Sequence, residues 1–275
     1  MSDIGFVLAE QFPAPQALEH AIAAERVGFD RLWHADHFHP WMDNQGHASQ
    51  AWVTLSAIGQ RTERIPFGTG VTCPSYRYHP AIVAQTFATL GLLYPGRVFL
   101  GVGTGEALNE QPLTGDWKNY ADRIERFGEA IAIIRRLWSG EWVDFDGNHF
   151  QLNQARIYDL PDQPVPLYIA AEGENSMRQA GRMGDGLISD SKTAAEPQMR
   201  AAFEEGARDA GKDPAQMPIL AEHFVVVGGE AEAREAAKHW RFIPQAWTKF
   251  VNYADPRRIM QDAEATISDE EVTSN

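Results

Sequence analysis

The stretch Val98–Asn109, which reads VFLGVGTGEALN, joins an apolar strand to a glycine-rich turn and the first residues of a helix. The three glycines of the turn remove side-chain bulk, so a ligand could approach the backbone closely at the end of the strand. The turn also carries an acid, Glu106, and an amide, Asn109. Glu106 stands where the dinucleotide-binding motif G-x-G-x-x-G requires its third glycine, which excludes that motif. A binding turn at a strand end is one interpretation, and a simple strand-to-helix turn is the other.

Short apolar strands alternate with amphipathic helices along the chain, which is typical of a parallel α/β sheet. Seven strands are predicted, at Ile4–Leu8, Asp30–Trp33, Pro66–Thr72, Val98–Val102, Pro166–Ala170, Gly186–Ser189 and Ile219–Val227. Helices with apolar residues at every third or fourth position are predicted between them, for example at Ala17–Val27, Ala81–Leu93 and Tyr120–Trp138. Seven such units without a dinucleotide motif favour a TIM barrel over an open doubly wound sheet.

Two segments depart from this alternation. Residues 141–153 alternate around Asp146 and Gly147, a dipeptide suited to a tight turn, and predict a hairpin inserted between barrel units. After the seventh strand only helices are predicted, at Ala231–Arg241 and Pro256–Ala265. We therefore expect one domain over residues 1–275, with a helical C-terminal segment at about 230–275. The last unit of the (β/α)8 barrel is expected to be missing.

The composition limits the classes of partner. The 275 residues carry a formal net charge of −14, which disfavours binding to nucleic acid or to an anionic membrane surface. No apolar run approaches the roughly 18 residues of a membrane span. The chain has one cysteine, Cys73, which excludes internal disulfides and fits a reducing compartment. A cytoplasmic protein with a small-molecule substrate is expected.

The segment Trp33–Trp41, which reads WHADHFHPW, follows the second predicted strand and holds three histidines and an aspartate. Side chains alternate along an extended chain, so His37, His39 and Asp36 can meet only where the chain turns. Histidine titrates near neutral pH, and a neighbouring carboxylate raises its basicity. Barrel active sites lie at the carboxyl ends of the strands, so we expect this segment and Glu106 at one edge. A surface loop with hydrogen-bonded histidines is the alternative.

Several longer segments carry a specific likeness. They are DHFHPW at Asp36–Trp41, CPSYRYHPAIVAQ at Cys73–Gln85, YPGRVFLGVGTGEALNE at Tyr94–Glu110, LWSGEWVDFDG at Leu137–Gly147 and AGRMGDG at Ala180–Gly186. With them the chain resembles the luciferase-like flavin and deazaflavin oxidoreductases, and most closely their coenzyme F420-dependent glucose-6-phosphate dehydrogenase branch. The resemblance extends over almost all of the first 190 residues and then weakens. It implies a TIM barrel of the luciferase-like type.

The resemblance implies coenzyme F420 as the cofactor, with FMN as the alternative. It implies a cofactor site formed by Asp36, Trp41, Gly70, Val71, Cys73, Gly105, Asn109, Glu172, Gly173, Asn175 and Ser176. A non-proline cis peptide bond between Gly70 and Val71 belongs to this expectation. Cys73 stands where a threonine is common in the family, which weakens one hydrogen bond and keeps the volume.

The implied reaction is hydride transfer between a substrate carbon and C5 of the deazaflavin, coupled to proton transfers. The implied catalytic residues are His37, acting at the substrate hydroxyl, and Glu106, exchanging a proton with the cofactor ring or the substrate. Which of the two is the acid and which the base stays open. Trp41 would stack beside the reacting centre, and Asp36 would orient His37 or touch the cofactor.

Trp41, Asp190, Lys192 and Lys249 are the implied substrate-binding residues. The two lysines correspond to phosphate-binding lysines of the sugar-phosphate enzymes, whereas Asp190 stands where those enzymes have a threonine. An aspartate repels a phosphate dianion, so glucose 6-phosphate itself is disfavoured. The expected substrate class is an alcohol, an aldehyde or a sugar-phosphate-like compound.

Three rival functions stay open. A zinc-dependent hydrolase would use Asp36, His37 and His39, with His223 as a later ligand, but we expect no metal. The other two are an FMN-dependent monooxygenase of the same superfamily and a non-catalytic deazaflavin-binding paralogue that lost its last barrel unit.

A homodimer is expected. The basis is that the aromatic residues Trp33, Trp52 and Phe87 look exposed in the sequence, and that many barrels of this superfamily are dimers.

Overall fold

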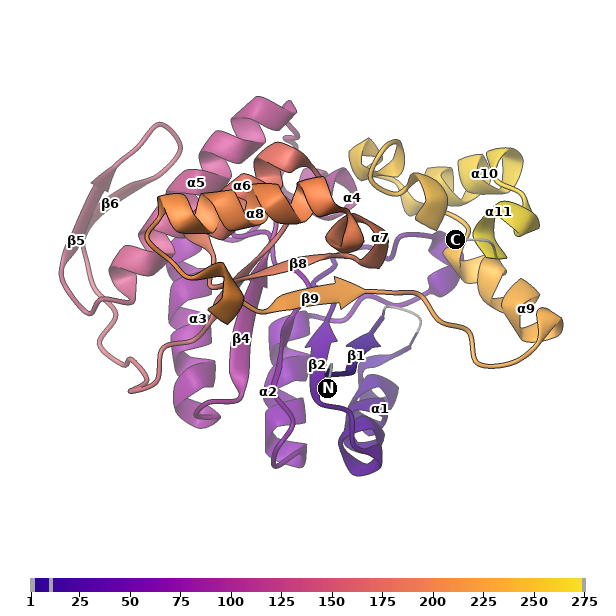
Figure 1. Ribbon diagram of the computed structural model, residues 1–275, viewed down its shortest axis with the longest axis horizontal. Helices are drawn as coiled ribbons and strands as arrows, with labels where there is room; N and C mark the ends of the chain where they lie inside the picture. The colour runs from indigo at the N-terminus through magenta and orange to yellow at the C-terminus, as the bar shows by residue number, and fades with distance from the viewer. Residues whose placement is uncertain (1–2, 10–11, 274–275) are drawn as a thin grey trace.

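The computed structural model describes residues 3–9 and 12–273 and contains a curled sheet of seven parallel strands (Figure 1). The strands pair in chain order and are β1 (Gly5–Leu8), β2 (Arg31–His34), β3 (Phe67–Thr69), β4 (Val98–Val102), β7 (Leu167–Ala170), β8 (Gly186–Asp190) and β9 (Ile219–Glu222). The expected TIM-barrel type of α/β fold is confirmed. Among the described residues the sheet has no eighth strand, and β1 and β9 form its two edges.

Helices follow the strands, as expected for βα units. They are α1 (Ala14–Val27), α2 (Ala51–Arg61), α3 (Pro80–Leu93), α4 (Ala107–Thr114), α5 (Tyr120–Leu137), α6 (Glu174–Met183), α7 (Ser191–Ala195) and α8 (Pro197–Asp209). The C-terminal segment adds α9 (Glu230–Trp240), α10 (Pro256–Thr266) and α11 (Asp269–Thr273). Short 3₁₀ turns lie at η1 (Asp43–Gln45), η2 (Pro214–Gln216), η3 (Ile243–Gln245) and η4 (Phe250–Asn252). Figure 1 shows α9, α10 and α11 gathered at the end of the sheet toward which β9 points.

Two predicted strands end too late. The third was predicted to reach Thr72, but β3 stops at Thr69, just before a cis peptide bond between Gly70 and Val71. Only Thr72 returns to the sheet, as an isolated bridge to Val102. The seventh was predicted to reach Val227, but β9 stops at Glu222, and the apolar residues that follow it are largely exposed. Their apolar pattern predicted a longer strand, but the pairing of β9 with β8 ends at Glu222.

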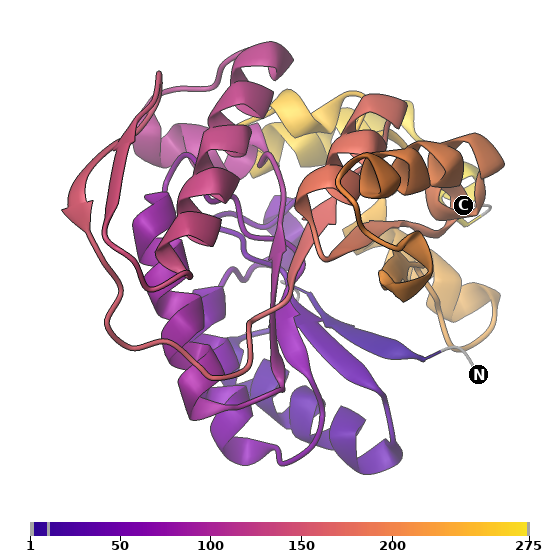
Figure 2. The same cartoon turned by 60° about the vertical axis from the view of Figure 1, so that its left-hand side comes forward.

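The inserted hairpin is present as β5 (Val143–Asp146) and β6 (Gln151–Ala155), which pair antiparallel. It follows α5 and stands at the periphery, away from the C-terminal helices (Figure 2). The prediction placed it at 141–153, two residues short of its observed end. It therefore takes no direct part in the end of the sheet that carries the C-terminal helices.

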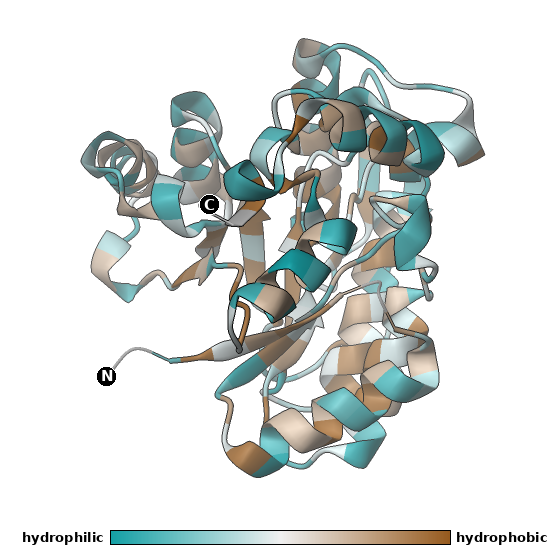
Figure 3. Cartoon of the chain, turned by 90° about the vertical axis from the view of Figure 1, so that its right-hand side faces the viewer, coloured by the Kyte–Doolittle hydropathy of each residue, from teal (hydrophilic) through white to brown (hydrophobic). Residues whose placement is uncertain are grey.

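Apolar side chains form three clusters. One fills the space between the sheet and its outer helices, and a second lies within the curl of the sheet, around Phe99 and Ile188. The aromatic residues that looked exposed in the sequence belong to these clusters: Trp33, Trp52 and Phe87 are 6%, 9% and 0% exposed. That expectation was wrong, because helix and strand packing covers all three. Figure 3 shows the apolar residues concentrated on the strands and the faces packed against them.

The third cluster belongs to the C-terminal segment. Phe242, Phe250 and Ile259 pack with Trp41, in the loop after β2, and with Leu108, at the start of α4. Hydrogen bonds reinforce the contact: the side-chain amides of Asn44 and Gln45 donate to backbone carbonyls at the end of α9, at 2.8 and 2.9 Å. The helical segment thus lies against the loops that carry the predicted site.

Candidate active site

The histidine segment and the glycine-rich turn meet through one amide. Asn109, in the first turn of α4, accepts hydrogen bonds from the backbone N–H of Phe38 at 2.9 Å and of His39 at 3.3 Å. Its Nδ2 donates to Oε2 of Glu106 at 2.9 Å. Asn109 is 1% exposed, so these bonds are shielded from water. The structure therefore joins the segment that carries His37 to Glu106, the predicted catalytic carboxylate.

His37 has a defined ring orientation. Its Nδ1 lies 3.0 Å from the carbonyl oxygen of His39. A carbonyl only accepts, so this bond requires a proton on Nδ1 and leaves Nε2 of the neutral ring with a free lone pair. The side chain is half-buried, and in this tautomer Nε2 can accept a proton.

Trp41 is held by aromatic residues that the sequence did not indicate. Its ring stacks on Phe242 at a centroid distance of 4.8 Å and meets Trp247 edge to face at 5.7 Å. Its ring centroid lies 5.8 Å from that of His37. Trp247 is about half exposed, in contrast to the buried Trp41. No motif marked Phe242 or Trp247, because their contact with Trp41 depends on how the C-terminal helices pack.

The glycines of the turn after β4 allow close packing against the loop that follows β3. A Cβ atom at position 103 would lie 2.8 Å from Cγ2 of Val71, and one at position 105 would lie 2.8 Å from Sγ of Cys73. Gly105 also has φ +83°, a conformation that favours glycine. The expected cis bond between Gly70 and Val71 is present. Gly70, Val71, Cys73 and Gly105 are thus brought together at the ends of β3 and β4.

Asp36 pairs with residues other than His37, which the sequence predicted as one of its possible partners. Its carboxylate accepts hydrogen bonds from Oγ1 of Thr72 at 2.6 Å and from the Arg77 guanidinium at 2.7 Å, and the Tyr78 hydroxyl lies at 3.4 Å. The side chain is 1% exposed. No hydrogen bond between Asp36 and His37 occurs in the described part of the chain, so Asp36 does not orient the His37 ring. The carbonyl of His39 does so instead.

Arg77 also contacts a second buried acid, Glu110 of α4. The guanidinium lies 3.4 Å from Oε1 of Glu110, and the backbone N–H of Arg77 donates to Oε2 at 3.0 Å. The Arg77 and Glu110 side chains are 4% and 1% exposed. Burial alone would lower the pKa of Arg77, but the carboxylates of Asp36 and Glu110 raise it, so the guanidinium stays protonated. Burial raises the pKa of Glu110 to about 7, although Arg77 opposes this.

Glu172 and Asp190 form a second pair of acids, just beyond the end of β7 and at the end of β8. Oε1 of Glu172 accepts the backbone N–H of Asp190 at 3.0 Å, and the two carboxyl groups are near enough to shift each other's pKa. Burial and then the Asp190 carboxylate raise the pKa of Glu172 to about 8. Burial alone would raise the pKa of Asp190, but hydrogen bonds from Glu172, Thr193 and the backbone lower it to about 2.

The predicted substrate lysines have different surroundings. Asp190 begins α7, and its Oδ1 accepts the backbone N–H groups of Lys192 and Thr193 at 2.8 and 2.9 Å. An internal carboxylate thus occupies these two donors. Nζ of Lys249 lies 3.7 Å from Oδ2 of Asp262 on α10 and 5.0 Å from the centroid of the Phe250 ring.

The remaining predicted cofactor residues lie before and at the start of α6. Oγ of Ser176 accepts the Gly173 N–H at 3.1 Å and donates to the Gly173 carbonyl at 2.8 Å. Oδ1 of Asn175 lies 3.4 Å from Nη1 of Arg178. The backbone N–H of Met177 makes the first bond within the helix, to Gly173. The N–H groups at the start of α6 therefore point out of the helix, as at other helix amino termini.

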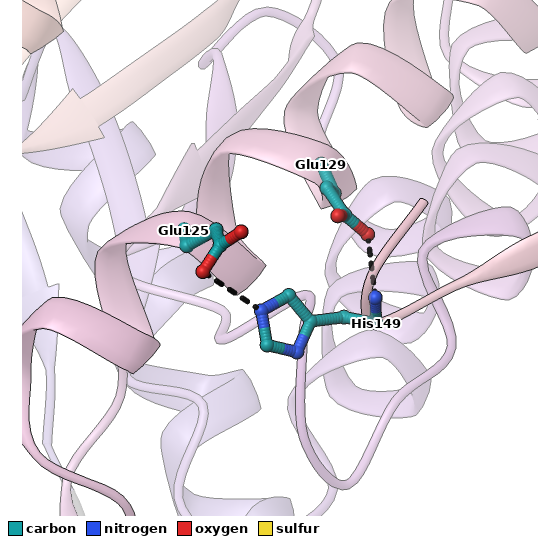
Figure 4. A group of neighbouring side chains, drawn as sticks. All are labelled: Glu125, Glu129 and His149. Atoms are coloured by element: carbon teal, nitrogen blue, oxygen red, sulfur yellow. Dashed lines mark hydrogen bonds and ion pairs between the residues drawn. The ribbon is translucent and has the colours of Figure 1, made fainter. Parts of the chain in front are cut away.

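The geometry does not support the zinc alternative. Donors occupy the Asp36 carboxylate, Nδ1 of His37 faces a carbonyl, and Nδ1 of His223 lies 2.8 Å from Oγ of Ser191. In residues 3–9 and 12–273 the only group with suitably spaced ligand atoms is Glu125, Glu129 and His149 (Figure 4). These side chains have structural partners in the hairpin, because Glu129 accepts the backbone N–H groups of residues 148–150 at 2.7 to 3.1 Å.

A family model described as luciferase-like monooxygenase matches residues 4–273. The chain belongs to the luciferase-like monooxygenase family. A curated relative in this family, the F420-dependent hydroxymycolic acid dehydrogenase of Mycobacterium tuberculosis, is 48% identical over 263 residues. That match covers 95% of this chain and 72% of the relative.

Two further proteins with F420 in their names are similar to this chain. The F420-dependent glucose-6-phosphate dehydrogenase of Segniliparus rotundus is 45% identical over 218 residues, covering 78% of this chain and 65% of that enzyme, which is less than two thirds of its length. Among solved structures, an F420-dependent secondary alcohol dehydrogenase in complex with an F420-acetone adduct superposes with a TM-score of 0.91 at 39% identity. It covers all of this chain and 84% of the solved chain. None of the helices in the described ranges is long and apolar enough to cross a membrane.

Proposed function

We propose that this protein is a coenzyme F420-dependent dehydrogenase that acts on a hydroxyl group of a small-molecule substrate. The observation that carries the proposal is the Asn109 bridge, which holds the His37 segment and Glu106 together at the carboxyl end of the sheet. The names of the relatives support F420 over FMN, since three proteins at 39 to 48% identity to this chain are named as F420-dependent dehydrogenases. The intact His37 and Glu106 argue against a non-catalytic paralogue.

The residues of the site fit a deazaflavin. Gly70, Val71, Gly105 and Trp41 would hold a flat ring system between small backbone and an aromatic wall. The close packing of positions 103 and 105 against Val71 and Cys73 fixes the loops after β3 and β4 relative to each other. The outward N–H groups at the start of α6, next to Gly173, would suit the phosphate of the cofactor. Asp36, Cys73, Asn109, Glu172, Asn175 and Ser176 remain predicted members of the site.

When bound, the deazaflavin supplies a carbon, C5, that exchanges a hydride with the substrate. In the proposed mechanism, Nε2 of His37 takes the proton of the substrate hydroxyl, because its Nδ1 proton is held by the carbonyl of His39. Glu106 holds a proton position on the cofactor side, and its bond from Asn109 fixes the carboxylate. Trp41, supported by Phe242, closes the reacting space and limits access of water.

The pair of Glu172 and Asp190 favours an uncharged alcohol or its carbonyl product over a phosphorylated sugar. Asp190 occupies two backbone donors with its own carboxylate, and a phosphate dianion would meet that negative charge. The positive charge of Lys249 already faces the Asp262 carboxylate, which weakens its attraction for a phosphate. A homodimer and a cytoplasmic location are also proposed; the exposed apolar residues Val53, Ile82 and Leu93 of α2 and α3 support the dimer.

Titration of the protein with oxidised F420 and with FMN tests the cofactor. We expect saturable binding of F420, measured by the change in its absorbance or fluorescence, and at least tenfold weaker binding of FMN. Tighter binding of FMN would refute the proposal in favour of the monooxygenase alternative. Failure to bind either compound would favour neither enzyme.

A further inference from the structure

A single side chain connects the three loops that form the site. Arg77 lies in the loop between β3 and α3 and contacts Asp36 in the loop after β2 and Glu110 on α4. One guanidinium nitrogen donates to both the carbonyl oxygen and the carboxylate of Asp36. Arg77 therefore connects three consecutive βα units at the carboxyl end of the sheet.

The bond to the Asp36 carbonyl bears directly on His37. This carbonyl belongs to the peptide unit that joins Asp36 to His37, so Arg77 fixes the plane of the peptide from which the His37 side chain departs. The charged guanidinium of Arg77 donates to this carbonyl, and the Arg77 and Asp36 side chains are both buried. Loss of that donor would release the peptide that sets the direction of the His37 side chain.

The contact with Glu110 acts on the other side of the site. The backbone N–H of Glu110 donates to the Glu106 carbonyl at 3.2 Å within the first turn of α4, and Asn109 precedes Glu110 in the chain. Anchoring the Glu110 side chain to both the guanidinium and the backbone N–H of Arg77 therefore fixes the start of α4. Glu106 and Asn109 are held in the same turn.

We propose that Arg77 is a positioning residue for the reaction, which sets the relative placement of His37 and Glu106 by holding Asp36 and Glu110 together. This inference rests on the proposed function. With a side chain 4% exposed, Arg77 has little surface with which to touch a substrate, so it acts through its two partners. Its planar fork reaches both acids at once, which a lysine ammonium cannot reproduce.

The test is Arg77→Lys, which keeps the charge and removes the fork. We expect turnover with a secondary alcohol to fall at least tenfold while the KM for the alcohol changes less than threefold. The Kd for F420, measured by titration without substrate, should rise about fivefold or more, because the loop after β2 contributes expected cofactor residues. Glu110→Gln, which keeps the volume and weakens one half of the bridge, should change the same quantities in the same direction.

Arg97→Lys is the matched control. Arg97 donates to the carbonyls of Thr62 and Ile65 near the amino end of the sheet, so its substitution removes a comparable arginine network away from the site. We expect Arg97→Lys to lower the melting temperature and to leave turnover and F420 affinity within twofold of wild type.

The inference is overturned if folded Arg77→Lys resembles Arg97→Lys, with lower stability but unchanged turnover and F420 affinity. If Arg77→Lys does not fold, Glu110→Gln decides by the same criteria. Failure of the wild-type protein to bind F420 would instead refute the proposed function, so the two failures are distinguishable.

Discussion

Two pairs of carboxyl groups lie at the carboxyl end of the sheet and are stabilised in different ways. Asp36 and Glu110 are separated by the guanidinium of Arg77, and all three side chains are nearly inaccessible to water. Glu172 and Asp190 have no base between them; their interaction raises the pKa of Glu172 and lowers that of Asp190, which places a proton on Glu172, and both are only partly buried. The first pair joins three loops, whereas the second joins two adjacent strand ends and caps a short helix.

The difference is that the first pair depends on a buried charged bridge, whereas the second depends on a proton held by one of its own two acids. Removing one partner from a buried ion pair costs about 3 to 5 kcal/mol, because the charge left behind has no partner. The arginine-bridged pair should therefore be intolerant of substitution. The proton-sharing pair should tolerate substitution but change with pH, since its proton leaves near the raised pKa of Glu172, about 8. Above that pH a second negative charge develops beside Asp190.

The larger effect expected for the second pair concerns stability against pH in Glu172→Gln. The ordinary pKa of Glu172 is 4.5 and its pKa in the fold is about 8, so the folded protein keeps a proton that the unfolded chain releases. The stability contributed by this group is therefore full below about pH 4.5 and declines as the pH rises toward 8. Glutamine donates a hydrogen bond to Asp190 at every pH. The variant should match wild type near pH 5 and exceed it by on the order of 1 kcal/mol near pH 9, after allowance for partial exposure.

Urea unfolding at the two pH values measures this effect. Glu174→Gln, at an exposed position on α6, is the control and should show no such pH-dependent gain. A Glu172→Gln variant whose stability parallels wild type from about pH 5 to pH 9 would show that the pair does not share a proton, and the contrast with the arginine-bridged pair would fail.

The smallest effect concerns substrate preference in Asp190→Thr. Threonine removes the negative charge and keeps a cap for α7, so the ratio of turnover with glucose 6-phosphate to turnover with a secondary alcohol should rise. An exposed charge contributes about 0 to 1 kcal/mol, which limits the change to about fivefold. Steady-state assays with both substrates measure the ratio. Asp190→Asn should change it in the same direction, and a ratio that falls in both variants would contradict the role given to Asp190.

Much of the fold could be predicted from local pattern. The strand that ends at Val102, the glycine-rich turn and the start of α4 were located because an apolar run, three glycines and a helix follow one another closely. The end of β9 could not be predicted, because the exposed Val225 and Val227 extend the apolar pattern beyond the residues that pair.

The site was predictable only in part. The histidine segment and Glu106 were found from residue type, but their connection depends on Asn109, whose partners in the histidine segment lie about 70 residues away. Arg77 lies within a segment that resembled the family, yet nothing local shows that its guanidinium reaches Asp36 and Glu110. Phe242 and Trp247 come from a segment with little resemblance, so their contact with Trp41 required the tertiary packing.

The central claim is that F420 bound at the carboxyl end of the sheet accepts a hydride from an alcohol substrate. His37 and Glu106 are the proton-transfer residues. The most direct measurement is the rate at which a secondary alcohol bleaches F420, for wild type, His37→Ala and Glu106→Gln. We predict that wild type bleaches the cofactor and that each variant binds F420 within a few fold of wild type but turns over about 100-fold more slowly, as is usual for loss of a proton-transfer group. Near wild-type turnover in either variant, or no bleaching by wild type with any secondary alcohol tested, would contradict the account.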